Sequence, residues 1–494
     1  MYTGGQSVND ADSNTFNEKE STGTTTFTNN NHNKSINLSA HTSAQAEAND
    51  LGALIFEYGT SRCKLGYAGE DFPHVYESIL SRRVGKDHFQ VAKEAKEMEF
   101  DTEGICDWLL KMGTTNLQVD WAERPLLLVE RPFGNFDKLS DKGVTLGRGI
   151  DTKEADSRMR SPNANVRNSV NAPIRHHLDS TILEHSKEDI KQSRKAREEM
   201  VQALMEQLQL PALFCSKSSV LACYANARTS GLVVEMGATY TSVSTVQEGY
   251  AFRYPRTQMV EFGGFDLDAF LQSRLHAQWE SQNLCTELKH PLWTYYTQAK
   301  ESNLCHVADS TFLENENTQL PRIQYELPDK TIISLGAERF SVAEHYFKSD
   351  IEDSRTVSTS PNGMSLSKLI CDVGGYTTET DARRDLFQNI IVTGGSSCFE
   401  NLTNRLEKEA AVSLQKRSFP VSGNTQPSMN TNSGTIGTGT NVRVKVIAAQ
   451  PQERKIGSFL GGSILGSLGS FHEMWMSKEE YAEHGPSLIH KKCP

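Results

Sequence analysis

The chain carries one local pattern twice, and this repeat constrains its fold more than any other feature. In "LIFEYGTSRCKLGY" (54–67) an apolar strand ends in an acid, Glu57, followed by a small-residue turn and a second strand. "LVVEMGATYTSVSTV" (232–246) has the same order around Glu235. One such pattern is usually an ordinary β-hairpin. Two copies, each at the start of a large block of sequence, predict two related halves.

Two facing hairpins of this kind could hold a phosphate between their turns. Backbone N–H groups at a turn tip form a concave anion site, and Lys64 lies just beyond the first turn. The carboxylates of Glu57 and Glu235 could face a hydrated Mg²⁺ or Ca²⁺. The candidate turn residues are Gly59, Thr60 and Ser61 in the first hairpin and Gly237, Ala238 and Thr239 in the second.

A third stretch, "NIIVTGGSSCF" (389–399), predicts a buried strand that ends at Gly394–Gly395 and continues into a helix. Glycine at this point allows the backbone to approach a flat ligand, and the helix N-terminus offers further N–H groups. Taken alone, the stretch also fits a plain strand–turn–helix.

The remaining ordered blocks alternate between strands and helices. "RPLLLVE" (124–130) predicts a buried strand, and helical spacing runs through 196–208 and 401–414. This alternation predicts an α/β fold with partly parallel sheets.

Composition separates three polar segments from these blocks. Residues 1–50 are rich in Asn, Thr and Ser, and too few apolar residues are present to offset chain entropy, so we expect a disordered tail. Residues 134–192 show no sustained period and predict a polar insertion, and 421–441 are of low complexity. We expect no signal peptide and no membrane span.

Charge and cysteine content narrow the class of partner. Nine cysteines without a CxxC pair fit a reducing compartment better than a disulfide scaffold or a zinc site. The net charge of −11 argues against broad nucleic-acid binding and suits basic protein partners, such as histones or a basic helix.

The C-terminal block "PQERKIGSFLGGSILGSLGSFHEMWMSKEEYAEHGPSLIHKKCP" (451–494) resembles the C-terminus of actin almost residue for residue. "YELPDKTIISLGAERF" (325–340) and "NARTSG" (226–231) are also similar to actin. The resemblance to the actin superfamily covers about 51–133 and 193–494, apart from the loop at 421–441. It implies two related α/β lobes around a nucleotide cleft, with four subdomains.

The resemblance also implies how the chain is divided into domains. The expected parts are a tail (1–50), the start of the first lobe with a reduced second subdomain (51–133), the insertion (134–192), the continued first lobe (193–230), the second lobe (231–449) and a C-terminal return to the first lobe (450–494).

"GATYT" (237–241), "VADSTF" (307–312) and the final "KKCP" resemble one nuclear subfamily within this superfamily. Its members serve in chromatin-remodelling and histone acetyltransferase complexes. The resemblance therefore implies a nuclear scaffold subunit that is not an enzyme.

The family's nucleotide contacts carry over to matching positions. Lys64 would contact the β- and γ-phosphates, and Lys300, Glu301 and Lys455 would lie around the adenine. The base and ribose would meet Gly394, Gly395, Ser396 and Phe399. The implied cofactor is ATP with Mg²⁺ or Ca²⁺, in a structural role, with the cation held through water by Glu57 and Glu235.

Hydrolysis is not expected, and no residue is assigned a catalytic role. Glu57 and Glu235 stand where actin has Asp, and one added methylene displaces a carboxylate by about 1 Å, which can cost roughly a hundredfold in an oriented reaction. Ser218 stands where actin has the Gln that orients the attacking water, and Ala238 where an Asp assists. Phosphoryl transfer needs a positioned water as well as charge.

Leu460, Ile464, Leu465, Leu468 and Phe471 recur at helical spacing near the C-terminus, and this predicts a core helix. In the actin fold the same segment lines a groove where partner helices dock, and the matching positions are Tyr224, Leu465, Leu468 and Met474. The implied partners are an amphipathic helicase/SANT-associated helix and an actin subunit, with histones as a further class. We expect no sequence-specific nucleic-acid binding and no homopolymer, because the region before Glu103 is short.

Two other classes remain open from sequence. A divergent, filament-forming cytoskeletal actin with ATPase activity would be cytoplasmic, and Ser218 and Ala238 count against it. A relative of Hsp70 or of the sugar kinases would share the two hairpins but not the 451–494 block.

Overall fold

The computed structural model describes residues 52–78, 102–132, 180–281, 292–313, 320–327, 330–348, 365–416 and 442–494. The chain divides into two compact units, residues 1–46 and 47–494, and every described residue belongs to the second. The expected tail, most of the expected insertion and the low-complexity loop lie outside the described residues.

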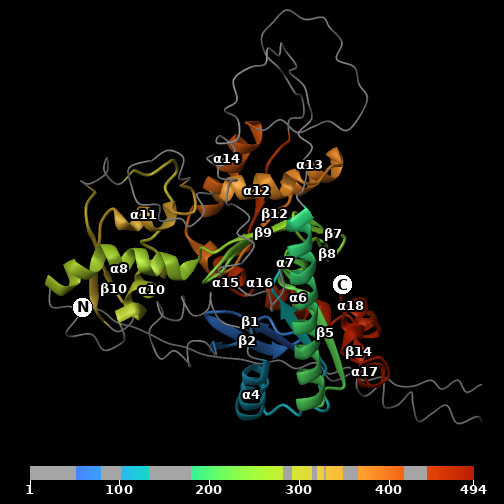
Figure 1. Ribbon diagram of the computed structural model, residues 1–494. Helices are drawn as coiled ribbons and strands as arrows, with labels where there is room; N and C mark the ends of the chain where they lie inside the picture. The colour runs from blue at the N-terminus through green and yellow to red at the C-terminus, as the bar shows by residue number, and fades with distance from the viewer. Residues whose placement is uncertain are drawn as a thin grey trace, which may run out of the picture. The chain divides into compact units, whose positions relative to one another are not determined.

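Within the described residues, a first six-stranded sheet has the order β14-β5-β4-β1-β2-β3 (Figure 1). Strands β5, β4 and β1 are parallel, and the other neighbours are antiparallel. The strands are β1 (Leu54–Tyr58), β2 (Arg62–Tyr67), β3 (His74–Glu77), β4 (Leu126–Glu130), β5 (Ala212–Lys217) and β14 (Met476–Ser477).

The second sheet repeats the arrangement of the first. Its path is β13-β12-β6-β7-β8, with β9 also paired to β7, and the antiparallel β6–β7 hairpin lies beside the parallel strand β12, as β1–β2 lies beside β4. The repeated hairpins and the α/β fold with partly parallel sheets are therefore confirmed. The strands are β6 (Gly231–Met236), β7 (Thr241–Gln247), β8 (Tyr250–Ala251), β9 (Thr257–Val260), β12 (Ile390–Thr393) and β13 (Val446–Ile447).

Helices cover the faces of both sheets. Helices α4 (Thr102–Met112) and α6 (Ser180–Gln207) pack on the first sheet. A π-helical turn, η1 (Gly113–Leu117), directly follows α4. With the second sheet are α8 (Gly264–Ser281), α10 (Leu292–Glu301), α11 (Glu338–Glu344), α12 (Leu366–Gly375), α13 (Thr380–Gln388) and α14 (Leu402–Gln415), and a short ribbon of β10 (Ile323–Glu326) and β11 (Ile332–Leu335).

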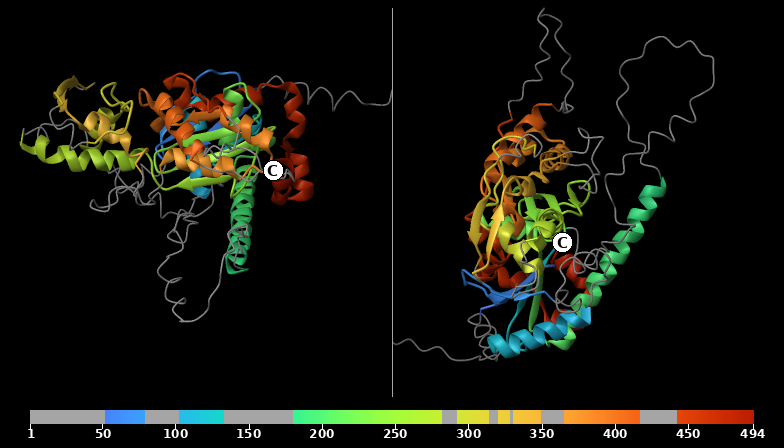
Figure 2. Two further views of the ribbon diagram at one scale, coloured as in Figure 1. Left: turned by 90° about the horizontal axis from the view of Figure 1, so that it is seen from above. Right: turned by 90° about the vertical axis from the view of Figure 1, so that its left-hand side faces the viewer.

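Helix α6 begins earlier than the sequence indicates. We expect a helix over 196–208, but α6 runs from Ser180, so residues 180–192 of the expected insertion are helical. Polar and charged residues dominate this stretch, and its Glu and Lys residues favour a helix without giving an apolar period. Helices α4 and α6 pack against each other, as Figure 2 shows at the lower edge of its right-hand view.

Two helices join the sheets. Helix α7 (Ser218–Ala225) contacts the second sheet through a small apolar cluster that includes Val220, Val233 and Ile391. Helix α16 (Gly457–Gly466) packs on α7 and on the first sheet. A Cβ on Gly461 would lie 1.8 Å from the carbonyl oxygen of Leu221, so only glycine allows this approach.

The C-terminal segment departs from the expected single helix through Leu468 and Phe471. Helix α16 ends at Gly466, Leu468 is extended at φ −82° and ψ 113°, and a 3-10 helix, η4 (Gly469–Met474), follows. The helical expectation for Leu468 is therefore wrong, because closely spaced glycines favour a break. The chain then forms α17 (Lys478–His484), η5 (Pro486–Leu488) and α18 (Ile489–Lys492).

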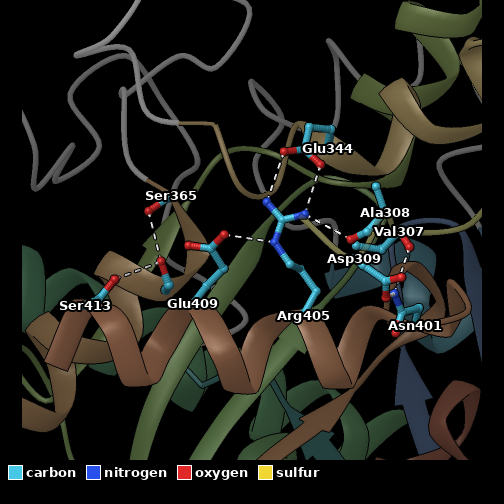
Figure 3. A network of polar contacts seen from close by, with 10 residues as sticks. Val307, Ala308, Asp309, Glu344, Ser365, Asn401, Arg405, Glu409 and Ser413 are labelled. Atoms are coloured by element: carbon cyan, nitrogen blue, oxygen red, sulfur yellow. Dashed lines mark hydrogen bonds and ion pairs between the residues drawn. The ribbon is translucent and has the colours of Figure 1, made fainter. Parts of the chain in front are cut away.

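A buried ion pair connects α14 to α11 (Figure 3). Arg405 on α14 lies 3.2 Å from Glu344 on α11, and both side chains are almost fully buried. Its Nε also donates to Glu409 at 2.8 Å, and Nη1 donates to the carbonyl of Ala308 at 2.9 Å. Removing one partner of such a pair is strongly destabilising, because a charge is left buried.

The described cysteines are free thiols. Among the described helices, none combines the length and apolar character that a membrane crossing requires.

The contact between α16 and α7 gives a stability prediction. Gly461→Ala should lower the free energy of unfolding by about 1–3 kcal/mol, because the added methyl group meets the Leu221 carbonyl. Gly469→Ala is the matched control, since its Cβ would meet nothing within 4 Å. Urea unfolding followed by circular dichroism measures both. Equal stability of the two variants would show that the helices separate without cost.

Candidate functional site

The turns of the two repeated hairpins meet. Thr60 follows β1, Thr239 follows β6, and their Oγ1 atoms lie 3.1 Å apart. Both threonines are buried, with 5% and 1% of their surfaces exposed. The structure thus brings together the two segments that the sequence predicts to face each other.

The tips of these turns carry backbone donors. No hydrogen bond to a described residue uses the N–H groups of Thr60, Ser61, Ala238 or Thr239. Successive N–H groups of this kind form a concave site for an anion. Because the donors come from both hairpins, one phosphate group could bind to both turns.

The second turn is held rigidly. The N–H of Gly237 donates to the Tyr240 carbonyl at 2.9 Å. The carbonyl of Gly237 accepts from the Gly264 N–H at 3.0 Å and from Ser396 Oγ at 2.9 Å. Ser396 therefore connects the second hairpin turn to the Gly394–Gly395 turn.

The two acids at the strand ends have different partners. Glu57 lies 2.5 Å from the ammonium of Lys64, and its second oxygen, Oε2, is buried without a partner among the described residues. Glu235 accepts a hydrogen bond from Ser218 Oγ at 3.1 Å. Burial raises the pKa of Glu235 to about 7, against the effect of the Ser218 hydrogen bond, and the charge of Glu57 adds to the increase.

The carboxylates of Glu57 and Glu235 suit a hydrated cation that phosphate also binds, and not a site enclosed by protein side chains alone. Among the described residues no group of three or more His, Cys, Asp or Glu side chains could enclose a metal ion. Two carboxylates, one with an unpartnered buried oxygen, suit a hydrated Mg²⁺ or Ca²⁺ that is also bound by phosphate. The residues that would hold it are Glu57 and Glu235.

Space is open at Gly395, where we expect the adenosine to bind. A Cβ on Gly395 would meet nothing within 4 Å. Glu301 and Lys455 lie 3.8 Å apart, and each side chain is about 40% exposed. Gly394 has φ +95°, and a Cβ there would lie 2.4 Å from the Met236 carbonyl, so glycine is required.

Lys300 and Phe399, which we expect near the adenosine, are occupied by contacts within the protein. The Lys300 ammonium lies 2.7 Å from Asp268 Oδ1 and donates to the Gly264 carbonyl at 2.7 Å, so it connects α10 to the start of α8. Phe399 is buried in the core of its sheet. Sequence reasoning missed Asp268, although it lies on the first turns of the helix that follows Gly264.

Sequence reasoning also missed Arg131. The residue directly follows β4, and its guanidinium lies 6.0 Å from the ring centroid of Tyr58 and 5.5 Å from that of Tyr240. Its Nη2 donates to Thr60 Oγ1 at 3.3 Å. The sequence did hold a clue to Arg131, because it directly follows the predicted strand 124–130. The carboxyl ends of the parallel strands β4 and β1 lie at the same edge of the sheet, so a residue after β4 lies near the first turn.

Of the expected partner positions, Leu465 lies on α16 and Tyr224 on α7, which packs on α16, whereas Leu468 and Met474 belong to the segment that follows α16. Leu468 and Met474 are each about half exposed, and Tyr224 and Leu465 are partly buried. Ile464, which the expected groove set omits, is 48% exposed on the same helix. We call these five residues the α16 surface.

Comparison with known proteins gives consistent matches. The family model described as Actin matches residues 179–494. A protein of Oryza sativa subsp. indica described as actin-related protein 4 is 30% identical over 90% of this chain and 99% of its own length. The Arabidopsis thaliana protein of the same description is 29% identical over 61% of this chain and 69% of its own length.

The buried acid Glu235 gives a pH prediction for the protein in EDTA without nucleotide. Because its folded-state pKa is about 7 and its ordinary value 4.5, the folded state keeps the proton longer than the unfolded state. This group therefore makes stability fall as the pH rises through that window. Glu235→Gln should remove this part of the slope and raise the unfolding free energy at pH 8.

Chemical denaturation between pH 4.5 and 8 measures the effect. Glu326→Gln on β10 is the control, since that side chain is 52% exposed. A Glu235→Gln profile parallel to that of the wild type would contradict the assignment.

Proposed function

Because this chain belongs to the actin family, we propose that it is a nuclear scaffold subunit that binds ATP without hydrolysing it. The relatives described as actin-related protein 4 support this placement over conventional actin. In the proposed role, the nucleotide stabilises the two halves of the fold, and the α16 surface binds a helix of a chromatin-remodelling or histone acetyltransferase complex.

The observation that carries the non-hydrolysing role is the hydrogen bond from Ser218 to Glu235. Ser218 stands where actin has the Gln that orients the attacking water. Its hydroxyl donates to Glu235 Oε2 at 3.1 Å, so its proton is directed at the carboxylate. Ala238 offers no polar side chain from the second turn. Without a positioned water, phosphoryl transfer loses the orientation on which its rate depends.

Nucleotide binding needs less than hydrolysis, and its requirements are present. The turn N–H groups of both hairpins would bind the phosphates, and Lys64 would exchange its bond with Glu57 for a phosphate contact. A bound Mg²⁺ or Ca²⁺ would supply charge neutralisation for the phosphates. Gly395, Glu301 and Lys455 would surround the base.

The proposed docking role rests on the α16 surface. Three half-exposed apolar side chains, Ile464, Leu468 and Met474, lie along one short segment of the chain. Apolar surface of this kind accepts one face of an amphipathic helix. The net charge of −11 favours a basic helix, and an actin subunit would be bound by the same partner.

Binding without turnover is tested with purified full-length protein and Mg-ATP. ATP at a hundredfold excess over its dissociation constant stabilises a protein by about 2.7 kcal/mol, so the thermal midpoint should rise. Lys64→Ala should lose this increase. Lys330→Ala, whose side chain is 82% exposed, should keep it. Labelled ATP should release phosphate no faster than background.

Phosphate release at the rate of filamentous actin would reject the scaffold in favour of the divergent filament-forming ATPase. The same sample also tests assembly. After high-speed centrifugation in Mg-ATP and salt, we expect the protein in the supernatant, and filaments in the pellet would support the alternative.

Docking is tested by a charge on the α16 surface. Met474→Glu should leave the thermal midpoint near that of the wild type but abolish co-purification with the partner helix and actin, because the partner's apolar face would have to desolvate the carboxylate. Val412→Glu is the matched control, since Val412 is 46% exposed on α14. Complexes that survive Met474→Glu would place the docking site elsewhere.

A further inference from the structure

Arg131 connects the two hairpins. Its guanidinium lies over Tyr58, the last residue of β1, and over Tyr240, which directly precedes β7. It also donates to the hydroxyl of Thr60, which contacts Thr239. One cation therefore contacts the first turn by hydrogen bond and an aromatic ring from each half.

The backbone below this guanidinium is anchored. Glu130 immediately precedes Arg131 and is almost fully buried. Its carboxylate lies 2.6 Å from Arg197 on α6 and 3.0 Å from Lys217 on β5. Because β4 is held between parallel neighbours as well, Arg131 leaves the sheet from a rigid base.

The two rings and the Thr60 hydroxyl hold the guanidinium beside the first turn. A guanidinium beside an aromatic ring is attracted by the negative charge of the ring face. An arginine held in this way loses little side-chain freedom when an anion binds. The Nη2 of Arg131 donates to Thr60 Oγ1, beside the backbone donors of the first turn.

We propose that Arg131 is a further nucleotide-binding residue, which contacts the terminal phosphate and so distinguishes a nucleoside triphosphate from a diphosphate. The proposal rests on the nucleotide site proposed above. Residue 131 is outside the positions that the resemblance to actin implies. Guanidinium groups bind phosphate oxygens with two parallel hydrogen bonds, which a lysine cannot do.

The order of contacts along the second turn assigns Arg131 to the terminal phosphate. Gly237, at the start of this turn, is connected to the adenosine side through Ser396. Tyr240, at its end, contacts Arg131. A nucleotide whose base lies near Gly395 would extend its phosphates along the turn away from Ser396, and its last phosphate would lie nearest Arg131.

Arg131 would add affinity rather than turnover. A cation beside a terminal phosphate accelerates transfer only when a nucleophile is positioned in line. Ser218 stands where actin has the Gln that orients the attacking water, and its hydroxyl is directed at Glu235. Binding energy that is the same in ground state and transition state tightens the complex without raising the rate.

The test compares ATP and ADP affinities of full-length Arg131→Gln by isothermal titration calorimetry with Mg²⁺. We expect ATP affinity to fall on the order of tenfold to a hundredfold, and ADP affinity to change by less than about threefold. Arg124→Gln is the matched control. Arg124 precedes the same strand, its guanidinium lies 5.2 Å from the Tyr67 ring centroid, and it donates to the Gly52 carbonyl.

A second variant, Arg131→Lys, keeps the positive charge but lacks the planar guanidinium that can form two parallel hydrogen bonds. Its ATP affinity should lie between those of the wild type and Arg131→Gln, with ADP affinity unchanged. If Arg131→Gln does not fold, this variant decides: wild-type ATP affinity in Arg131→Lys would overturn the proposal.

The other possible affinities of Arg131→Gln and of the wild type also decide between the proposals. Equal losses of ATP and ADP affinity in Arg131→Gln would show that Arg131 supports the fold or the whole site, and the proposal would be wrong while nucleotide binding stands. Unchanged affinities in that variant would also reject it. A wild-type protein that binds neither nucleotide would overturn the proposed function itself.

Discussion

The close approach of α16 to α7 is the contact on which the arrangement of the molecule depends. Gly461 lies against the backbone of Leu221, with no room for a side chain. Helix α7 contacts the second sheet and α16 contacts the first, so this approach determines how near the two sheets lie. Their repeated hairpins then meet at Thr60 and Thr239. A larger separation would leave two ordinary hairpins with no shared site.

Once the turns meet, the polar groups around them determine what chemistry is available. In the proposed nucleotide site the phosphate-binding donors would be backbone N–H groups, so a substitution in a turn, such as Ala238, would leave them in place. Catalysis depends on side chains, and these differ from actin: Ser218 is bonded to a buried acid, Glu235. A site built on backbone donors can therefore keep its ligand after the side chains needed for turnover are lost.

The charged groups near the site are held mainly by other parts of the chain. Lys300 pairs with Asp268 and Arg131 contacts two tyrosine rings, so each cation also fastens one element to another. A ligand that binds such groups stabilises the elements they join, because it binds only when they are in place. In a scaffold subunit, the nucleotide would then act as part of the folded structure.

The sequence alone determined the two hairpins, the acids Glu57 and Glu235, the glycine turn at 394–395 and the family, because each is encoded by residues that are neighbours in the chain. Tertiary structure decided three other features: the contact between Thr60 and Thr239, the pairing of Lys300 with Asp268, and the position of Arg131 between rings from both halves. Their residues are distant in sequence or belong to different elements, and no local period records such contacts. The Lys300–Asp268 pair depends on how α10 packs against α8. The other two contacts exist only because helices hold the two sheets at one particular separation, and that separation depends on side-chain volumes such as the missing one at Gly461.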